Sequence, residues 1–508
     1  MDKLDRILSL PTAKPYRSGK IDPSEQLHFN EHGHLDFAPN DIENPKDWSM
    51  ARRYYITMVA VMLVVNATFA SSAPSGCLEG ISKEFGVSHT AAGLVITLFL
   101  LGYCAGPLVF APLSEFYGRR YVFYITFTCY LAFTFLCAFA PNFGSLLVGR
   151  LLAGTFASAP LTNAPGVLAD VWGPIERANC MAIFSVMTFA GPALGPVISG
   201  FLELTETWRW TFYVLLMFGG ASAILMFTIP ETLPPAVLLH KARRIRKANP
   251  AYKDVQSPAE AEERKLSSIF RVALLRPWQI LFDPISFLVA IYMSVVYTLL
   301  YMLFTIYPIV FQQKRGWNSG VGELPLIGTI IGAAIGGAII VLNSSRDRRN
   351  IESGRSLAPE DRLFLPMFAA VSFPVTMFWF GWSANFNSVH WIVPVIAGVF
   401  LATSIMLLFV GFLNYLTDTY LMYTASAMAA NTICRSACGA AAPLFTEQMF
   451  TALGVGGGAS LIGGVGIVLS PIPFIFYRYG RTIREKSRFA PTGQKPVKKD
   501  EEVESPLR

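Results

Sequence analysis

Two apolar runs meet at a short charged turn in the stretch Gly102-Tyr-Cys-Ala-Gly-Pro-Leu-Val-Phe-Ala-Pro-Leu-Ser-Glu-Phe-Tyr-Gly-Arg-Arg120. Gly102 and Gly106 are one helical turn apart, and small residues at this spacing let two membrane helices approach closely. Gly118 permits a tight turn before the second run. The stretch therefore predicts two consecutive membrane helices that are joined at one membrane face.

The charges of this turn allow two interpretations. Glu115, Arg119 and Arg120 can pair across the interface between two helical bundles. Such a latch would favour one of two conformations, as alternating access to the two membrane faces requires. Alternatively, the turn is a positive segment that fixes the orientation of the helices. The residue chemistry alone leaves both interpretations open.

Apolar runs of the same kind recur on both sides of this turn, and a helix needs about 20 apolar residues to cross the hydrocarbon core. The predicted spans are Tyr55–Ala73, Ala91–Pro112, Tyr121–Ala140, Phe143–Val167, Asn179–Leu202, Trp210–Ile229, Pro284–Phe311, Leu324–Leu342, Phe364–Phe380, Val389–Tyr415, Met422–Thr451 and Ala459–Tyr477. Two sets of six flank one long polar segment, a plan common among transporters with two repeated halves.

The predicted domains follow from these runs. They are a cytoplasmic N-terminal tail (1–53), an N-terminal six-helix bundle (54–230), a cytoplasmic central loop (231–282), a C-terminal six-helix bundle (283–478) and a cytoplasmic C-terminal tail (479–508). The first 40 residues and Ser487–Arg508 are polar, and we expect them to be disordered. The fold class is that of an all-α integral membrane protein.

The composition supports a membrane protein. The chain of 508 residues is 53% hydrophobic and only 15% charged, whereas soluble domains carry about 25% charged residues. So few charges cannot cover so much apolar surface, and we expect a lipid bilayer to solvate it. The net charge of +7 comes from residues between the apolar runs. No folded basic domain with aromatic stacking platforms is indicated, so we do not expect nucleic-acid binding.

Lysine and arginine residues accumulate on one side if the twelve spans alternate. That side holds Lys46, Arg52, Arg53, Arg119, Arg120, the cluster at 241–247, four arginines at 346–355 and the cluster at 478–486. The opposite side holds little more than Lys83, Arg209, Lys314 and Arg315. The positive-inside rule then places both termini in the cytoplasm.

A single arginine, Arg150, lies within the fourth predicted span. A charged residue at the centre of a span costs about 2.5–3.5 kcal/mol on insertion scales, so such residues are functional by default. The alternative is a side chain that reaches back to the interface. We favour a functional arginine, because Arg150 lies well inside the run.

Small residues recur along one face of the fifth predicted span, Gly-Pro-Ala-Leu-Gly-Pro-Val-Ile-Ser-Gly at 191–200. Gly191 and Gly195 are followed by a serine at the same four-residue spacing, which makes a groove for close packing. Each of the two prolines removes an amide donor and bends the helix. The segment is either a pivot between moving parts or a site of ordinary close packing.

These motifs resemble those of the major facilitator superfamily. The charged turn is similar to the loop between the second and third helices of that family, with Glu115 where the family usually has Asp. The stretch that starts at Arg150 is similar to its proton-coupling motif Arg-x-x-Gln-Gly, with Ala153 in place of Gln. The fifth span resembles the motif of the antiporter branch, carried by Gly191, Pro192, Gly195, Pro196 and Gly200.

Shorter matches are similar to the twelve-span fungal drug:proton antiporters of this superfamily, which export drugs, polyamines or secondary metabolites. They are Asn44–Ser49, Trp208–Trp210, Pro230–Thr232 and Asn414–Tyr420. The resemblance covers roughly 44–485 of the chain. It implies the major facilitator fold, two six-helix bundles around a central cavity. It also implies a conformational latch made of Gly106, Glu115, Gly118, Arg119 and Arg120.

Polar groups deep in the spans are the candidates for substrate binding. Tyr297 and Tyr301 lie one turn apart on one face, and their rings suit a flat, mostly apolar ligand, although tyrosines of an interfacial belt are the alternative. Buried amides either bond a neighbouring helix or face the cavity. The candidate cavity residues are Asn66, Asn163, Tyr297, Tyr301, Asn431 and Arg435.

Proton coupling requires a group that titrates, and no acid lies plainly at the centre of a predicted span. Proton antiport is therefore implied by the resemblance. Arg150 and Asp170 are the best candidates on chemistry, because burial near an arginine changes the proton affinity of a carboxyl group.

The expected function is secondary active, proton-coupled efflux of small amphipathic organic compounds by alternating access. The alternative is a proton-coupled uptake carrier or facilitator for a small polar solute on the same fold. We do not expect an enzyme, since no clustered histidines or paired acids mark the end of a span, nor an ATP-driven pump, since no Gly-x4-Gly-Lys-Ser/Thr loop is present. We expect a monomer in the plasma or vacuolar membrane, with substrate, protons and lipid as partners and without metal or cofactor.

Overall fold

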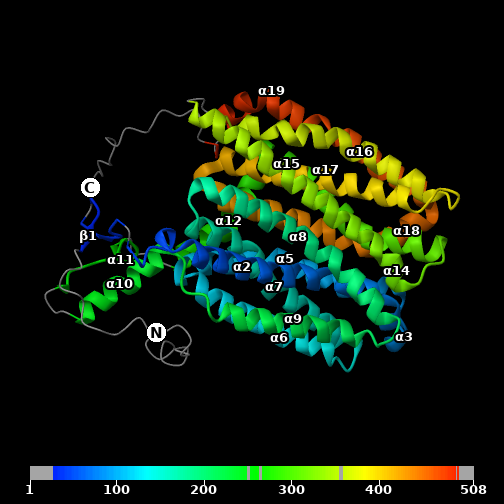
Figure 1. The fold of residues 1–508 in the computed structure, drawn as a ribbon, viewed down its shortest axis with the longest axis horizontal. Coiled ribbons are helices and arrows are strands. Elements are labelled where there is room, and N and C mark those ends of the chain that lie inside the picture. The colour runs from blue at the N-terminus through cyan, green and yellow to red at the C-terminus, as the bar shows by residue number, and fades with distance from the viewer. Residues whose placement is uncertain are drawn as a thin grey trace, which may run out of the picture.

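The computed structural model describes residues 27–31, 33–39, 41–248, 252–261, 266–353, 358–487 and 489–490. The long helices run side by side along the longest axis of the molecule (Figure 1). Residues 1–26 and 491–508, for which the sequence predicts disorder, lie outside the described part of the chain.

Six long helices form the N-terminal half. They are α2 (Met50–Ser72), α5 (Leu94–Tyr117), α6 (Arg119–Ala138), α7 (Phe143–Val171), α8 (Pro174–Glu203) and α9 (Arg209–Met226), with η2 (Ala73–Cys77), α3 (Leu78–Phe85) and α4 (His89–Ala92) between α2 and α5. Local signals set their ends. The Oδ1 atom of Asn142 accepts a hydrogen bond from the amide of Ser145 at 2.8 Å and caps α7, because the first amides of a helix lack partners within it.

The C-terminal half repeats this plan. It consists of α13 (Pro284–Tyr307), η4 (Pro308–Lys314), α14 (Ser319–Glu323), η5 (Leu324–Leu326), α15 (Ile327–Glu352), η6 (Pro359–Leu363), α16 (Phe364–Asn385), α17 (Ile392–Tyr420), η7 (Leu421–Tyr423), α18 (Thr424–Leu469) and α19 (Pro471–Lys486). The two halves meet where α18 packs against α5 and where α15 and α14 pack against α8.

Twelve membrane spans follow from these helices. The described residues contain 11 helical stretches that are long and apolar enough to cross a bilayer, and the last of them, Thr424–Lys486, has 63 residues. At a rise of 1.5 Å per residue this stretch would be about 95 Å long, roughly three times the hydrocarbon thickness. Its backbone leaves the helical region at Gly454, where φ is 70° and ψ is 169°. The break lies between the two predicted spans Met422–Thr451 and Ala459–Tyr477, so the expected fold is confirmed.

The outer surface of the helices is apolar. Ile224 on α9 is 71% exposed and Val468 on α18 is 76% exposed. Side chains of this size are not left in water over a whole surface, since continuous exposed apolar patches mark membrane or protein contacts. Lipid is therefore the solvent of the bundle, as the composition predicts.

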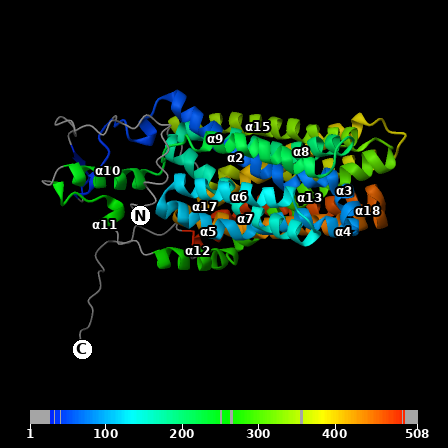
Figure 2. The ribbon, with the colours of Figure 1, turned by 90° about the horizontal axis from the view of Figure 1, so that it is seen from below.

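The polar segment between the halves is folded, which the sequence did not predict. It contains α10 (Pro234–Ala248), α11 (Pro258–Ala261) and α12 (Leu266–Leu281), and α10 and α11 lie beyond one end of the bundle (Figures 1 and 2). Arg246 binds both carboxylate oxygens of Glu260 at 2.9 and 2.6 Å. These hydrogen bonds lower the pKa of Glu260.

The described part of the first 40 residues is also ordered, so the prediction of disorder is wrong there. The strands β1 (His28–Phe29) and β2 (Leu35–Asp36) pair antiparallel. Leu35 is fully buried in a small apolar cluster with Leu238 and Ile245 of α10, and its amide donates to the Gln256 carbonyl at 2.9 Å. The apolar face of α10 supplies the packing that makes this hairpin stable, a contact that local composition does not reveal.

Candidate functional site

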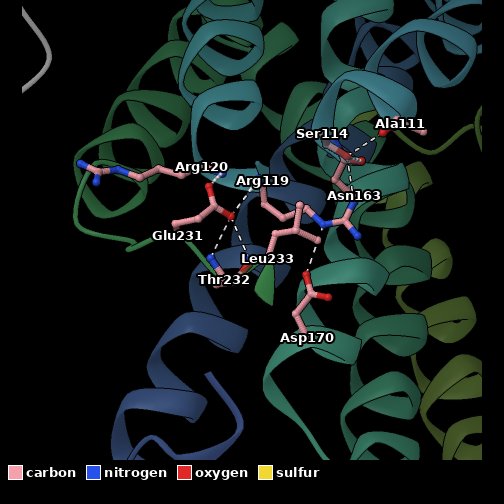
Figure 3. A network of polar contacts seen from close by, with 9 residues as sticks. All are labelled: Ala111, Ser114, Arg119, Arg120, Asn163, Asp170, Glu231, Thr232 and Leu233. Carbon is pink, nitrogen blue, oxygen red and sulfur yellow. Dashed lines mark hydrogen bonds and ion pairs between the residues drawn. The ribbon is translucent and has the colours of Figure 1, made fainter. Parts of the chain in front are cut away.

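The charged turn lies close to the start of α10, because it contacts Glu231, three residues before that helix, and Figure 3 shows the polar contacts around it. Gly118 separates α5 from α6 with a φ of 101°, a conformation that favours glycine. The first amides of α6 have no partner within their own helix. The Glu231 carboxylate accepts the amide of Arg119 at 3.0 Å and that of Arg120 at 3.1 Å. An acid in this position also suits the positive end of the helix dipole.

The same carboxylate orders the chain that leaves α9. Its Oε1 atom accepts the amides of Thr232 and Leu233, both at 2.9 Å. Glu231 therefore binds the start of α6 to the start of the central segment. No role for this acid could be predicted, because the residues that it joins are separated by more than 100 positions in the chain.

Arg119 extends this network into α7. Its Nε atom lies 3.2 Å from an Asp170 oxygen, and its Nη1 atom donates to the Ser114 hydroxyl at 2.7 Å. That hydroxyl in turn lies 2.9 Å from Oδ1 of Asn163. Asn163 and Asp170 thus belong to this group, which we call the turn cluster: Ser114, Arg119, Asn163, Asp170 and Glu231.

The structure bears on two expectations for these residues. Glu115 is exposed on α5, and the acid that binds the turn is Glu231 instead. Asn163, a candidate for the cavity, bonds the neighbouring helix α5 through its Oδ1 atom. The turn cluster joins elements of the N-terminal half to the start of the central segment and to no described element of the C-terminal half, so in this conformation it stabilises the N-terminal half. Its use as a latch between the two halves stays a proposal.

Replacing Glu231 with alanine tests whether its carboxylate stabilises the N-terminal half. The change leaves two amides at the start of α6 without an acceptor, and loss of a helix cap costs about 1–2 kcal/mol. We expect a lower melting temperature in detergent for Glu231→Ala. Glu231→Gln keeps one acceptor oxygen and should fall between the alanine variant and the wild type. Equal melting temperatures for all three proteins would contradict the role assigned to this carboxylate.

Arg150 is buried in the N-terminal half, at 1% exposure. Its guanidinium lies over the Phe99 ring at 4.1 Å from the centroid, and it donates to the carbonyls of Val95 on α5 at 2.8 Å and Ala70 on α2 at 2.9 Å. Among the described residues it has no ion pair. Asp170 is 20 positions further along the same helix, about 30 Å away, so the two proposed coupling residues do not meet.

The antiporter-like segment on α8 packs against both halves. A Cβ atom at Gly191 would meet the Thr68 side chain, and one at Gly195 would lie 2.8 Å from the Ala73 amide, both in the N-terminal half. The carbonyl of Pro192 cannot bond the residue four positions on, which is Pro196 and has no amide hydrogen. The Ser72 hydroxyl donates to this carbonyl instead, at 2.7 Å. The segment is closely packed against its neighbours, as the sequence predicts, and the bend at the two prolines stays a prediction.

Four of the predicted cavity residues form a cluster where the halves meet. The Tyr301 hydroxyl on α13 lies 2.9 Å from the Ser71 hydroxyl on α2 and 3.5 Å from the Tyr297 hydroxyl. The Arg435 guanidinium lies 5.2 Å from the Tyr297 ring centroid. We call Tyr297, Tyr301, Asn431 and Arg435 the central cluster.

The central cluster holds polar atoms without partners. Arg435 is 8% exposed, lies over the Phe409 ring at 4.7 Å, and its Nε and Nη1 atoms make no hydrogen bond. Asn431, one turn away on α18, is buried with both amide atoms unpaired. Unpaired buried donors cost free energy unless a ligand or water satisfies them. Asn66, the remaining candidate, lies beside Gly219 of α9 within the N-terminal half.

A chamber of about 880 Å³ opens at the other end of the bundle, near α3 and α14. It lies between η2 of the N-terminal half and α13 with η4 of the C-terminal half, and we call it the α14 chamber. Its lining contains six glutamates, at positions 79, 84, 203, 206, 323 and 447, together with Lys83 and His89. Glu323 is the buried one, at 1% exposure.

Glu323 was missed in the sequence because it precedes the predicted span Leu324–Leu342 by one residue. The sequence signal that could have identified Glu323 is a single acid immediately before a long apolar run. Only the structure shows that α14 turns this acid inward, toward the junction of the halves.

Two bundles of six spans with polar and aromatic groups at their junction define a membrane transporter with two halves. The sequence pattern of the Major Facilitator Superfamily matches residues 58–443, so the chain belongs to that superfamily.

Two relatives and one solved structure illustrate the match. "Efflux pump FUB11" of Gibberella moniliformis is 41% identical over 466 residues, which are 90% of this chain and 77% of that protein. "Major facilitator superfamily multidrug transporter mdrA" of Aspergillus fumigatus is 37% identical over 92% of this chain and 79% of its own length. The proton:xylose symporter XylE, bound to 6-bromo-6-deoxy-D-glucose, shares the fold with a TM-score of 0.60, at 15% identity over 85% of this chain and 96% of its own.

Proposed function

We propose that this transporter exports small amphipathic organic compounds in exchange for protons, by alternating access of the two halves. The observation that carries the proposal is the central cluster, where an arginine with unpaired donors lies between aromatic rings. Aromatic faces suit the flat apolar part of a ligand, and the guanidinium suits an acceptor group on it. The names of the relatives, an efflux pump and a multidrug transporter, favour export.

We further propose that the α10 end faces the cytoplasm. Arg119 contacts Glu231 just before α10, and Arg246 lies on α10 itself, whereas the α14 chamber has Lys83 and His89 among six glutamates. The positive-inside rule then places both termini in the cytoplasm and the chamber on the outer side. We propose a monomer in the plasma membrane, since the central cluster of the C-terminal half meets Ser71 of the N-terminal half within one chain.

Transport in proteoliposomes tests the proposal. Purified full-length protein is reconstituted so that the α10 end faces outward, the lumen is made acidic, and rhodamine B, an aromatic dye with a carboxylate, is added outside. An antiporter will concentrate the dye in the lumen as protons leave. A proton-coupled uptake carrier on the same fold will instead expel preloaded dye under the same gradient. Failure of the dye to respond to the gradient in either direction would contradict coupled transport.

The variant Arg435→Met tests whether the central cluster binds the substrate. It removes both unpaired donors but keeps an apolar chain of similar length. A charged hydrogen bond contributes about 1.5–3 kcal/mol, so we expect the dye concentration at half-maximal transport to rise about 10-fold or more. The control is Arg481→Met, an exposed arginine paired with Glu485 at 3.1 Å, which should transport like the wild type. Unchanged half-saturation in Arg435→Met would exclude this residue from the binding site.

A further inference from the structure

Glu323 is a buried carboxyl group with one hydrogen bond. Its Oε1 atom accepts from Nε2 of Gln312 at 3.1 Å, and its Oε2 atom has no partner. A carboxylate in such a place loses its hydration and gains little in return, which favours the neutral, protonated acid. Because the side chain also lines the α14 chamber, a proton from the aqueous side can reach it.

The charges around Glu323 do not stabilise a carboxylate. Glu203 of α8 lines the same chamber and adds a second negative charge there. The Oε1 atom of Glu203 accepts the Gly80 amide at 2.9 Å. The two basic residues among the chamber lining are engaged elsewhere, since Lys83 pairs with Glu79 at 2.6 Å and His89 pairs with Glu447 at 2.8 Å.

The remaining charged groups near this site do not neutralise Glu323 either. On η4, Lys314 donates to the side chain of Asn385 at 3.0 Å. Glu84 pairs with Arg209 at 2.6 Å, and Glu206 is exposed. Within the described part of the chain, no cation is placed to neutralise Glu323.

The position of Glu323 couples it to the contact between the halves. A Cβ atom at Gly200, the last residue of the antiporter-like segment, would lie 3.0 Å from Cγ of Glu323 and 2.6 Å from the Ser319 carbonyl. The Ser319 hydroxyl donates to the Gly200 carbonyl at 3.1 Å. The helix that carries Glu323 therefore packs directly on α8 of the opposite half, with the Ser319 carbonyl against Gly200.

We propose that Glu323 is the proton-binding group of the outer side, and that its protonation closes the contact between α14 and α8. This inference rests on the proposed antiport. The proton comes from water in the α14 chamber and binds the free Oε2 atom, which leaves a neutral acid that can stay buried against Gly200. As a carboxylate, the same group requires water, so the contact widens and the chamber opens. Proton entry from outside thus drives the return of the empty carrier toward the cytoplasmic side.

An infrared titration tests the proton site without any substrate. Purified full-length protein in lipid is titrated, and the carbonyl stretch of protonated carboxyl groups is followed against pH. We expect one component of this band to disappear in the variant Glu323→Gln and to remain in the control Glu206→Gln, which changes an exposed acid of the same chamber. An unchanged band in Glu323→Gln would overturn the assignment.

Spin labels test the conformational part. One label replaces Thr207 and the other Gln313, two exposed residues that line the chamber from opposite halves. In the wild-type background we expect the distance between labels to shorten as the pH falls. With Glu323→Gln, a neutral side chain of the same shape, the short distance should persist at every pH. A distance that is independent of pH in the wild type, or unaffected by the variant, would overturn the proposed closure.

These outcomes are separable from the proposed function. If the distances follow pH through Glu323 but rhodamine B is not concentrated in the lumen, then the dye-export proposal fails and the proton site stands. If the wild type concentrates the dye and Glu323→Gln does so equally well, then the antiport stands and Glu323 is not its proton site.

Discussion

Replacing Arg150 with methionine will lower the free energy of unfolding by about 2–4 kcal/mol, the loss expected for charged hydrogen bonds to buried acceptors, and will abolish transport. The reason lies in the end of α2. The helical partner of the Ala70 carbonyl would be the amide of residue 74, which is a proline without an amide hydrogen. Arg150 supplies the missing donor at 2.9 Å and joins α2, α5 and α7 at the same time.

The melting temperature in detergent measures this loss, and dye transport measures its consequence. Arg150→Lys is the matched control for charge, because an ammonium group keeps the positive charge but cannot reach both carbonyls in the fixed geometry of a guanidinium. We expect its stability to lie between those of the wild type and Arg150→Met. A methionine variant that melts and transports like the wild type would refute the role of Arg150 in joining the three helices, together with any role in coupling.

Replacing Gly102 with valine should prevent the folded protein from accumulating. A Cβ atom at this position would lie 2.6 Å from the Leu151 carbonyl oxygen and 2.7 Å from the Gly154 carbonyl carbon, both of them backbone atoms of α7. Overpacking a close-packed site costs about 1–3 kcal/mol even where side chains can move aside. Here the helices themselves must separate, and such a loss is a large fraction of the roughly 5–15 kcal/mol typical of native stability.

Gel filtration of the detergent-solubilised protein checks this prediction. The matched control is Gly220→Val on α9, which makes the same change within a helix at a site with open space around an added Cβ atom. We expect a monodisperse peak for the control and its loss for Gly102→Val. Comparable peaks for both variants would show that the approach of α5 and α7 is looser than the structure indicates.

The sequence predicts the spans well because their signal is local. Runs of about 20 apolar residues locate each helix, and even the break in the last stretch falls at Gly454, between two predicted spans. The close helix packing at Gly191 and Gly195 could also be predicted, because small residues at a four-residue spacing indicate a close neighbour. The identity of that neighbour, α2, came only from the structure.

The polar sites were less predictable because they depend on which helix faces meet. Glu231 joins residues more than 100 positions away, and no local pattern reveals such a contact. The amides of Asn66 and Asn163 could not be assigned to the cavity or to a neighbouring helix before the packing was known. The pair of Arg150 and Asp170, in contrast, could have been excluded from the sequence, since 20 positions along one helix place them about 30 Å apart.

The central claim is that substrate and protons move in opposite directions through one carrier, and thermodynamic linkage requires such coupling to work both ways. The most direct test is to load proteoliposomes with rhodamine B at equal internal and external pH, dilute them into dye-free medium, and record the luminal pH. As the dye leaves, an antiporter must draw protons inward, so we predict acidification of the lumen that disappears with a protonophore. Dye that leaves through the protein while the luminal pH stays constant would contradict proton antiport.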